Sequence, residues 1–170
     1  MTENLSIRTV VHDDLPLLLA WRNHPDVRRF MYSQHEISQE EHEAWFEKVS
    51  QDPNRHLLLY LEHQTPLGFC QFTTYQSRAE WGFYLSPDAP PGTGKSLGKA
   101  ALDFAFLQHQ WHKVSGEALS YNQPSIRFHT KLGFTEEGCL REHAKIGESF
   151  YDVFCFGLLR SEWDSKREKL

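Results

Sequence analysis

A glycine-rich segment, G-T-G-K-S-L-G at residues 92–98, joins a strand-like run to a helix-like run. The first amides of a helix have no partner within the helix, and together with the helix dipole they attract a phosphate or a diphosphate. Glycine lets a ligand approach this backbone because it carries no Cβ. The segment therefore predicts an anion-binding loop, and the alternative is a flexible turn that holds no ligand.

Two nucleotide-binding motifs come close to this segment. Residues 89–96 resemble a P-loop, G-x-x-x-x-G-K-S/T, but Ala89 replaces its first glycine. A nucleoside triphosphatase also needs an acid after a second apolar strand to hold magnesium, and no Asp follows the run at 113–120. A P-loop nucleotide-binding protein is kept as an alternative. A dinucleotide fingerprint fails because Leu97 stands at its third glycine.

A second signal follows the next strand-like run. Residues 122–134, N-Q-P-S-I-R-F-H-T-K-L-G-F, resemble the second signature of the GCN5-related N-acetyltransferase (GNAT) superfamily, N-x-x-A-i-x-x-Y-x-k-x-G-F. The glycine segment then resembles the first signature, Q/R-x-x-G-x-G/A, with Thr93 for Gln or Arg and Ser96 for Gly. Two signatures about 30 residues apart, in the family order, are more specific than either alone.

This resemblance implies an α+β fold, in which helices flank a mixed seven-stranded sheet and two central parallel strands splay apart. The strands that splay are expected at 80–85 and 113–120. Acetyl-coenzyme A (acetyl-CoA) is the implied co-substrate, with its diphosphate on the loop amides, and no metal is expected. The residues implied for cofactor binding are Phe83, Leu85, Gly92, Thr93, Gly94, Lys95, Ser96, Leu97, Gly98, Lys99, Asn122 and Ser125.

Acyl transfer from a thioester to an amine needs a neutral amine, a donor for the carbonyl oxygen and a proton for the leaving sulfur. His129 stands where the family usually carries a tyrosine that protonates the CoA thiolate, so we expect it to donate that proton. Glu117 is expected to take the amine proton through water or to hold a cationic amine, and Tyr84 to reach the thioester or the acceptor. The alternatives are that His129 is a helix residue without a catalytic role, that Glu117 is a solvent-facing strand residue, and that Tyr84 is a core aromatic. The family's oxyanion donor, a backbone N–H, would lie near 83–85.

The N-terminal third, which sets the acceptor in this superfamily, combines aromatic, basic and histidine residues. Helix packing explains Trp21, Trp45 and Phe46 as core residues, but not the polar residues near the same loops. Arginine offers a fork for phosphate, and tyrosine or histidine can stack on a base, so the set suits a nucleotide-linked acceptor. The residues expected to contact the acceptor are Trp21, Arg22, Asn23, His24, Met31, Tyr32 and Gln71.

This N-terminal segment, together with E-W-G-F-Y-L at residues 80–85 and L-R-E-H at residues 140–143, resembles the N-acetyltransferases of pseudaminic acid biosynthesis. The resemblance extends from about residue 7 to residue 163. This implies acetyl transfer to the 4-amino group of a UDP-linked 4-amino-4,6-dideoxy-N-acetyl-altrosamine, on a route to flagellin glycosylation. The alternatives are a RimJ/RimL-like protein N-terminal or polyamine acetyltransferase, which shares W-R-N and L-L-R-x-E-W, and an acyl-CoA-binding regulatory domain. We expect few acids near the cleft, which favours an anionic acceptor over a polyamine.

Hydrophobic spacing predicts the elements that must position these residues. We expect strands at 5–10, 56–61, 67–75, 80–85, 113–120, 135–145 and 150–159. Helices are expected at 15–21, after a capping box at 38–41, at 97–110 and at 122–131, with a charged, frayed tail at 162–170. No linker or repeat divides the chain, so residues 1–170 are expected to form one domain.

Composition indicates an ordinary globular protein, 39% hydrophobic and 24% charged, with a net charge of -5 and no basic stripe for nucleic acid. Cys70, Cys139 and Cys155 are odd in number and lie outside any C-x-x-C motif, so neither a disulfide framework nor a zinc site is expected. Residues 1–11 are polar and alternating, without the apolar stretch of a signal peptide, and no apolar run reaches membrane-spanning length, so neither segment is expected. We expect a cytoplasmic enzyme with no membrane partner, compatible with a homodimer.

Overall fold

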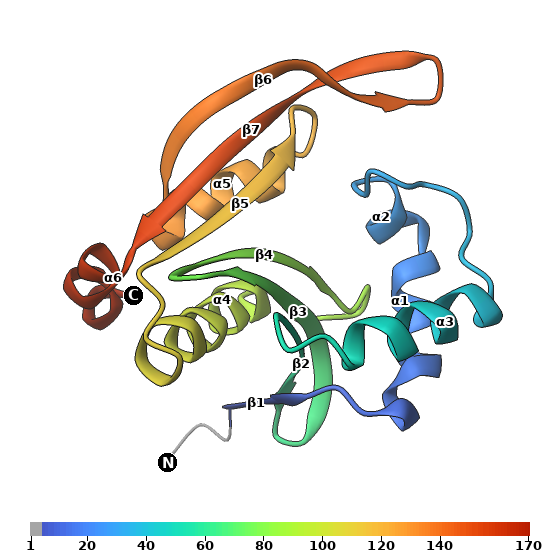
Figure 1. Cartoon of the computed structure of the whole chain (residues 1–170), viewed down its shortest axis with the longest axis horizontal. Coiled ribbons are helices and arrows are strands. Elements are labelled where there is room, and N and C mark those ends of the chain that lie inside the picture. Colours follow the sequence, from blue (N-terminus) through green and yellow to red (C-terminus); the bar gives the residue numbers. More distant parts are fainter. Residues whose placement is uncertain (1–4) are drawn as a thin grey trace.

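The computed structural model describes residues 5–170. Its strands form one seven-stranded sheet in the order β1-β2-β3-β4-β5-β7-β6 (Figure 1). Neighbouring strands are antiparallel except β4 and β5, which are parallel. The predicted α+β fold with a mixed seven-stranded sheet is confirmed.

The strands are β1 (Leu5–Thr9), β2 (Arg55–Glu62), β3 (Thr65–Tyr75), β4 (Arg78–Leu85), β5 (Lys113–Leu119), β6 (Thr135–Ile146) and β7 (Ser149–Leu159). The helices are α1 (Leu15–Asn23), α2 (Pro25–Arg28), α3 (Gln39–Ser50), α4 (Thr93–Asp103), α5 (Gln123–Leu132) and α6 (Arg160–Lys166). Within residues 5–170, no helix combines the length and the apolar character that crossing a bilayer requires.

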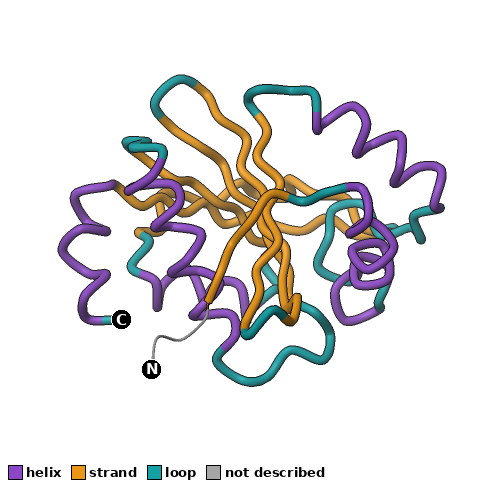
Figure 2. Tube along the Cα trace, turned by 90° about the horizontal axis from the view of Figure 1, so that it is seen from below, coloured by secondary structure: helices purple, strands orange, loops and turns teal. Residues whose placement is uncertain are grey.

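Helices lie on either side of the sheet (Figure 2), and β2 is buried on both of its faces. Successive residues of a strand point to opposite faces. In β2, Leu57 and Leu59 accordingly pack in a cluster with Leu18 of α1, whereas Leu58 and Tyr60 pack in the cluster that contains the buried side of α4. The run of apolar residues in β2 is therefore explained by two cores rather than one.

The parallel pairing of β4 with β5 covers only three residue pairs. Residues 78–80 of β4 pair with Lys113, Val114 and Ser115, and beyond that point β5 pairs only with β7. The two strands then separate, which leaves residues 81–85 and 116–119 facing a gap (Figure 1). The predicted splay of the two central parallel strands is confirmed.

The helix after the glycine segment begins earlier than the hydrophobic spacing indicated. α4 begins at Thr93 rather than at Leu97, and Gly92 is its N-cap with a φ of 93°. A positive φ of this size is readily adopted only by glycine. The first turn of α4 has no apolar periodicity, so the spacing could not reveal it. The glycine segment is thus itself the start of the helix.

The ends of α3 and α5 agree with the capping signals in the sequence. Ser38 accepts a hydrogen bond from the Glu41 amide at 3.1 Å, and Asn122 accepts one from the Ser125 amide at 3.2 Å. Gly133 follows α5 with a φ of 97°, as expected for a glycine just past a helix end. These caps fix where the second signature motif begins and ends.

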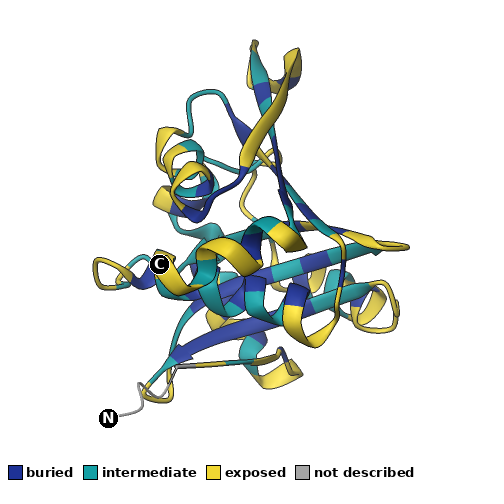
Figure 3. Cartoon of the chain, turned by 90° about the vertical axis from the view of Figure 1, so that its left-hand side faces the viewer, coloured by how far each residue is buried: buried dark blue, intermediate teal, exposed yellow. Residues whose placement is uncertain are grey.

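The hairpin of β6 and β7 projects from the body of the protein, and β6 is almost entirely exposed (Figure 3). The register between the two strands shifts between Leu140 and Ala144. Within this bulge Glu142 has a φ of 48°, and its amide donates to the Asp152 carboxylate at 2.7 Å. A bulge of this kind bends a strand and redirects its side chains.

The C-terminal tail is ordered, and the expectation that it frays is wrong. Residues 160–166 form α6, and Trp163 is completely buried beside Phe106. The Asp103 carboxylate accepts hydrogen bonds from the Trp163 indole at 2.9 Å and from the Arg167 guanidinium at 3.0 Å. One buried tryptophan thus holds a tail whose other residues are mostly charged.

Replacing Trp163 tests this anchor. Trp163→Ala should lower the free energy of unfolding by roughly 3–5 kcal/mol, because it empties a large core site and removes a bond to Asp103. Urea unfolding followed by fluorescence or circular dichroism measures the change. Asp164→Ala, an exposed neighbour, is the control and should change the free energy by less than about 0.5 kcal/mol. Equal effects of the two substitutions would contradict the role of Trp163.

Candidate active site

A cavity of about 930 Å³ lies where β4 and β5 separate. Its walls come from α1, from the segment between α2 and α3, from α3, and from β3, β4, β5 and α5. Residues 80–86 form one side, and residues 115–119 form the other. A concave space of this size is typical of small-molecule sites.

The cavity brings together about half of the residues predicted for catalysis and cofactor binding. Those in its lining are Tyr84, Glu117, Phe83, Leu85, Gly94, Leu97, Asn122 and Ser125. Gly92, Thr93, Lys95, Ser96, Gly98, Lys99 and His129 lie outside the lining. Thr93 is buried, and its hydroxyl donates to the Pro90 carbonyl oxygen at 2.8 Å, so its side chain closes the turn before α4.

The predicted acceptor residues divide into two groups. Arg22, Met31, Tyr32 and Gln71 line the cavity. Trp21 instead is buried in the core beside α3, and His24 caps α2 by accepting the Asp26 amide at 3.2 Å. Asn23 exchanges two hydrogen bonds of 2.8 Å with the backbone of Ile37. The second group therefore lies outside the cavity lining.

The first turn of α4 leaves one amide pointing away from the helix without a partner. The amides of Lys95 and Ser96 donate to the Gly92 carbonyl oxygen, and the amide of Thr93 donates to the Pro90 carbonyl oxygen. The Gly94 amide forms no hydrogen bond within residues 5–170, and Gly94 lines the cavity. This amide, with the positive end of the helix dipole, fits a phosphate group.

Tyr32 and Glu117 form a direct hydrogen bond across the cavity. The Tyr32 hydroxyl donates to Glu117 Oε2 at 2.6 Å, and the two residues are 85 positions apart in the chain. Burial and the adjacent Glu117 carboxylate raise the pKa of Tyr32 well above its usual range. Both residues also line a smaller concavity of about 260 Å³ formed with residues 143–146 of β6. The pair therefore stands at the boundary between the cavity and the projecting hairpin.

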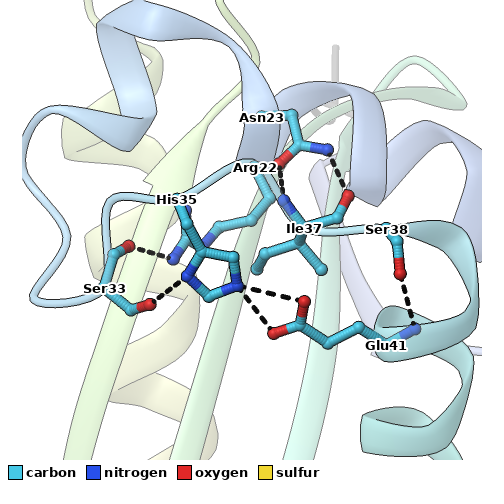
Figure 4. A network of polar contacts seen from close by, with 7 residues as sticks. All are labelled: Arg22, Asn23, Ser33, His35, Ile37, Ser38 and Glu41. Carbon is cyan, nitrogen blue, oxygen red and sulfur yellow. Dashed lines mark hydrogen bonds and ion pairs between the residues drawn. The ribbon is translucent and has the colours of Figure 1, made fainter.

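Polar contacts hold the segment between α2 and α3 in place (Figure 4). His35 bridges this segment to α3: its Nδ1 lies 2.8 Å from the Ser33 hydroxyl, and its Nε2 lies 2.9 Å from the Glu41 carboxylate. The residue before His35, Gln34, donates to the Tyr121 hydroxyl at 2.9 Å, beside the start of α5. Tyr32 is thus carried by a segment tied to both sides of the gap.

The guanidinium of Arg22 is only partly satisfied. Its Nη2 donates to the Ser33 carbonyl oxygen at 2.8 Å, whereas its Nη1 is buried and has no hydrogen-bond partner among the described residues (Figure 4). Burial lowers the pKa of Arg22. A buried charged donor without a partner is costly. Since Arg22 lines the cavity, a ligand oxygen could satisfy this nitrogen.

His129 is buried, with only 1% of its surface exposed, and both of its ring nitrogens are engaged. Its Nδ1 donates to the Ser125 carbonyl oxygen at 2.8 Å, and its Nε2 accepts from the Trp81 indole N–H at 3.0 Å. Burial lowers the pKa of His129 to about 4, so the ring is neutral at pH 7. The expectation that His129 donates a proton to CoA as an imidazolium therefore does not fit this geometry.

The contact between Trp81 and His129 depends on Gly116, which the sequence reasoning did not single out. A Cβ at Gly116 would lie 2.5 Å from the Trp81 indole nitrogen and 2.6 Å from His129 Nε2. Trp81 and Gly116 both line the cavity. A glycine in the middle of a strand often marks a close approach by another group, and this was the available signal.

The cavity is more acidic than the sequence indicated, and the expectation of few acids near the cleft is wrong. Its lining includes five carboxylates, from Asp26, Glu41, Glu80, Glu117 and Glu137. These residues come from five separate elements, α2, α3, β4, β5 and β6, so only the fold brings them together. Within residues 5–170, no group of three or more His, Cys, Asp and Glu residues is arranged to hold a metal ion.

The neutral, buried state of His129 predicts a pH-dependent stability. The pKa of His129 is about 4 in the folded protein and about 6.5 in an unfolded chain, so the unfolded state binds the proton first as the pH falls. The contribution of neutral His129 to the free energy of unfolding is fully present above about pH 6.5. It is lost between about pH 6.5 and pH 4, and the loss amounts to roughly 3 kcal/mol at most. Urea unfolding from pH 7 to pH 4 should show a shallower decline for His129→Gln than for the wild type. Parallel declines would contradict this assignment.

Gly116→Ala tests the close approach at the gap. The added methyl group would enter the bond between Trp81 and His129, and overpacking of this kind costs roughly 1–3 kcal/mol. Thermal and urea unfolding should report this loss. Gly138→Ala, in β6, is the matched control because a Cβ there meets nothing within 4 Å. A Gly116→Ala protein as stable as the control would show that the gap can adapt.

Comparisons with known proteins agree with this geometry. Residues 4–135 match the acetyltransferase (GNAT) domain. The chain is 29% identical over 167 residues to the uncharacterized N-acetyltransferase YokL from the SPbeta prophage of Bacillus subtilis, which covers 95% of this chain and 93% of the relative. It is 27% identical over 123 residues to the acetyltransferase PseH of Campylobacter jejuni, covering 72% and 77%.

Among solved structures, the fold matches a spermidine N-acetyltransferase from Vibrio cholerae in complex with CoA and spermine. The TM-score is 0.86 at 22% identity, and the match covers 94% of this chain and 97% of the other. The split sheet, the helix that begins at the glycine segment and the sequence match over residues 4–135 lead to one conclusion. The chain belongs to the GNAT family and is an acetyl-CoA-dependent N-acetyltransferase.

Proposed function

We propose that this enzyme acetylates the 4-amino group of a UDP-linked 4-amino-4,6-dideoxy-N-acetyl-altrosamine, the acceptor used in pseudaminic acid biosynthesis. The observation that carries the proposal is the charge pattern of the cavity, which leaves one cation and one carboxylate without an opposite charge bonded to it. Such a site suits an acceptor with one amine and an anionic part. The 27% identity to the acetyltransferase PseH supports the same assignment.

Arg22 is the cation. Its Nη1 is buried and lacks a partner among the described residues, so an oxygen from the acceptor would complete its hydrogen bonds. A phosphate oxygen is a strong partner for a guanidinium. Nearby in the lining, the rings of His42 and Trp45 stack at 5.2 Å, which provides a flat apolar surface for a base. A nucleotide diphosphate carries both features.

Glu117 is the carboxylate. Of the five acids in the lining, Glu41, Glu80 and Glu137 are paired with cationic or histidine groups at 3.1 Å or less, and Asp26 lies 3.9 Å from Arg29. Glu117 instead accepts a neutral hydroxyl from Tyr32 and forms no ion pair within the described part of the chain. One carboxylate thus remains to receive the proton of one amine.

The direction of the amides in β4 supports direct attack on a thioester in the gap. The Ser86 amide donates to Leu67 of β3, and amides of an antiparallel strand alternate between its two sides. The amides of Phe83 and Leu85 therefore face the gap. In the proposed reaction they stabilise the carbonyl oxygen as the amine attacks the thioester carbon and the CoA sulfur leaves.

A polyamine acetyltransferase is the competing assignment, and the five carboxylates of the lining favour it. The Vibrio cholerae neighbour is named for spermidine, and a polyamine needs acids along its length. We favour the nucleotide sugar because four of the five acids already face cationic or histidine groups, and because Arg22 would repel a polycation.

A panel of acceptors tests the proposal. Release of CoA thiol from acetyl-CoA would be measured with the UDP-4-amino sugar, with spermidine and with a peptide that has a free N-terminus. We expect kcat/KM for the UDP-4-amino sugar to exceed the others by 100-fold or more. Preference for spermidine would support the competing assignment, and turnover of the peptide alone would reject both.

Arg22→Ala tests the predicted anion contact. It should raise KM for the UDP-4-amino sugar by 10-fold or more, because Arg22 would hold the phosphates of the nucleotide. KM for the same amino sugar without the nucleotide should change much less, because that acceptor carries no phosphate. Initial rates with the two acceptors measure the difference. Lys48→Ala, an exposed cation on α3, is the control and should leave both values unchanged. An equal rise for both acceptors would indicate that Arg22 acts only by holding Ser33.

A further inference from the structure

Acetyl transfer from CoA leaves a thiolate that needs a proton, and the structure removes the residue expected to supply it. His129 occupies the donor position of the signature motif, but Trp81 and the Ser125 carbonyl oxygen engage its two nitrogens. It also lies outside the cavity lining. The proton must therefore come from another group that faces the gap.

The hydroxyl groups in the lining differ in what they contact. Ser115 donates to the Ala79 carbonyl oxygen at 3.4 Å, and Tyr84 donates to the Leu18 carbonyl oxygen at 3.5 Å. These carbonyl oxygens cannot return a proton to a hydroxyl that has lost one. Tyr32 is the hydroxyl in the described lining that donates to a carboxylate, Glu117, at 2.6 Å. A donor joined to a base can be reprotonated within the site.

The position of this pair fits the reaction. Glu117 lies two residues beyond Ser115, the last residue of β5 that pairs with β4, so it stands on the β5 side of the gap. Tyr32 reaches it from the opposite side, on the segment held by Gln34, Tyr121 and Arg22. The hydroxyl thus bridges the two sides of the cavity at the place where the strands part.

We propose that Tyr32, rather than His129, gives the departing CoA sulfur its proton, and that Glu117 supplies Tyr32 with the proton taken from the amine. The amine nitrogen bonds to the acetyl carbon, and the carbon–sulfur bond breaks. The amine proton passes to Glu117, the Tyr32 O–H proton passes to sulfur, and the proton on Glu117 passes to the Tyr32 oxygen. One proton moves from nitrogen to sulfur, and both side chains return to their starting states.

The environment of Tyr32 explains why the two transfers must be coupled. Burial and Glu117 raise the pKa of Tyr32, whereas a thiol has a reference pKa of about 8.5. A phenol this weakly acidic does not protonate a thiolate by itself to a useful extent. It can do so when a protonated Glu117 replaces its proton at the same time. This inference rests on the acetyl transfer already assigned and not on the identity of the acceptor.

Replacing the phenol measures its contribution. With the acceptor that the panel identifies, Tyr32→Phe should lower kcat roughly 100-fold, with KM for the acceptor changed less than about threefold. Tyr121→Phe is the matched control: it also removes a hydroxyl that ties down the same segment, through Arg29 and Gln34, but it lies outside the cavity lining. A similar loss of kcat in both variants, or a loss confined to KM, would overturn the proposal.

A change of phenol acidity separates proton transfer from positioning. Fluorotyrosines at position 32 keep the shape and the hydrogen bond but lower the pKa of the phenol. In the fluorinated variants a high-pH limb of the kcat profile should appear and move to lower pH in step with the fluorination, because a phenolate cannot donate. An absent or unmoved limb would mean that Tyr32 only orients Glu117. Failure of the UDP-sugar proposal would appear instead in the wild-type acceptor panel, whatever the variants do.

Discussion

The limited pairing of β4 with β5 is the constraint on which the site depends. Three residue pairs hold the strands together, and beyond Ser115 the backbones separate. The two strands can stay apart because each has another partner, β3 for β4 and β7 for β5, so that their remaining backbone groups on the outer sides are satisfied. Amides that face the gap are left for a ligand, which is why the cavity forms there.

Side chains at the base of the gap are packed too closely to serve as mobile catalytic groups. Trp81, Gly116 and His129 interlock, and His129 stays neutral because it is buried between an indole donor and a carbonyl acceptor. The proton chemistry proposed here therefore moves outward, to the more accessible pair of Tyr32 and Glu117. The motif position at which a proton donor was expected instead holds a buried histidine that accepts a hydrogen bond from Trp81, a residue of the cavity wall.

Much of the architecture could be predicted because local rules govern it. The alternating and apolar runs located the strands within a few residues, the capping box at Ser38 marked the start of α3, and α5 was placed within one residue at each end. The start of α4 at Thr93 was missed because a polar first turn has no hydrophobic period. The ordered tail was missed because one residue, Trp163, outweighs the charged residues around it once Phe106 and Asp103 are beside it.

By itself the sequence determined the family, the order of the elements and the glycine segment, because signature motifs and hydrophobic periods are properties of neighbouring residues. Tertiary structure alone decided which side chains meet. Glu117, which accepts from Tyr32, lies 85 positions away in the chain, and Trp81, which donates to His129, lies 48 positions away. It also gathered five carboxylates around one cavity and left an Arg22 nitrogen without a partner among the described residues. Protonation state and charge balance depend on distances through space, which the spacing of residues along the chain does not specify.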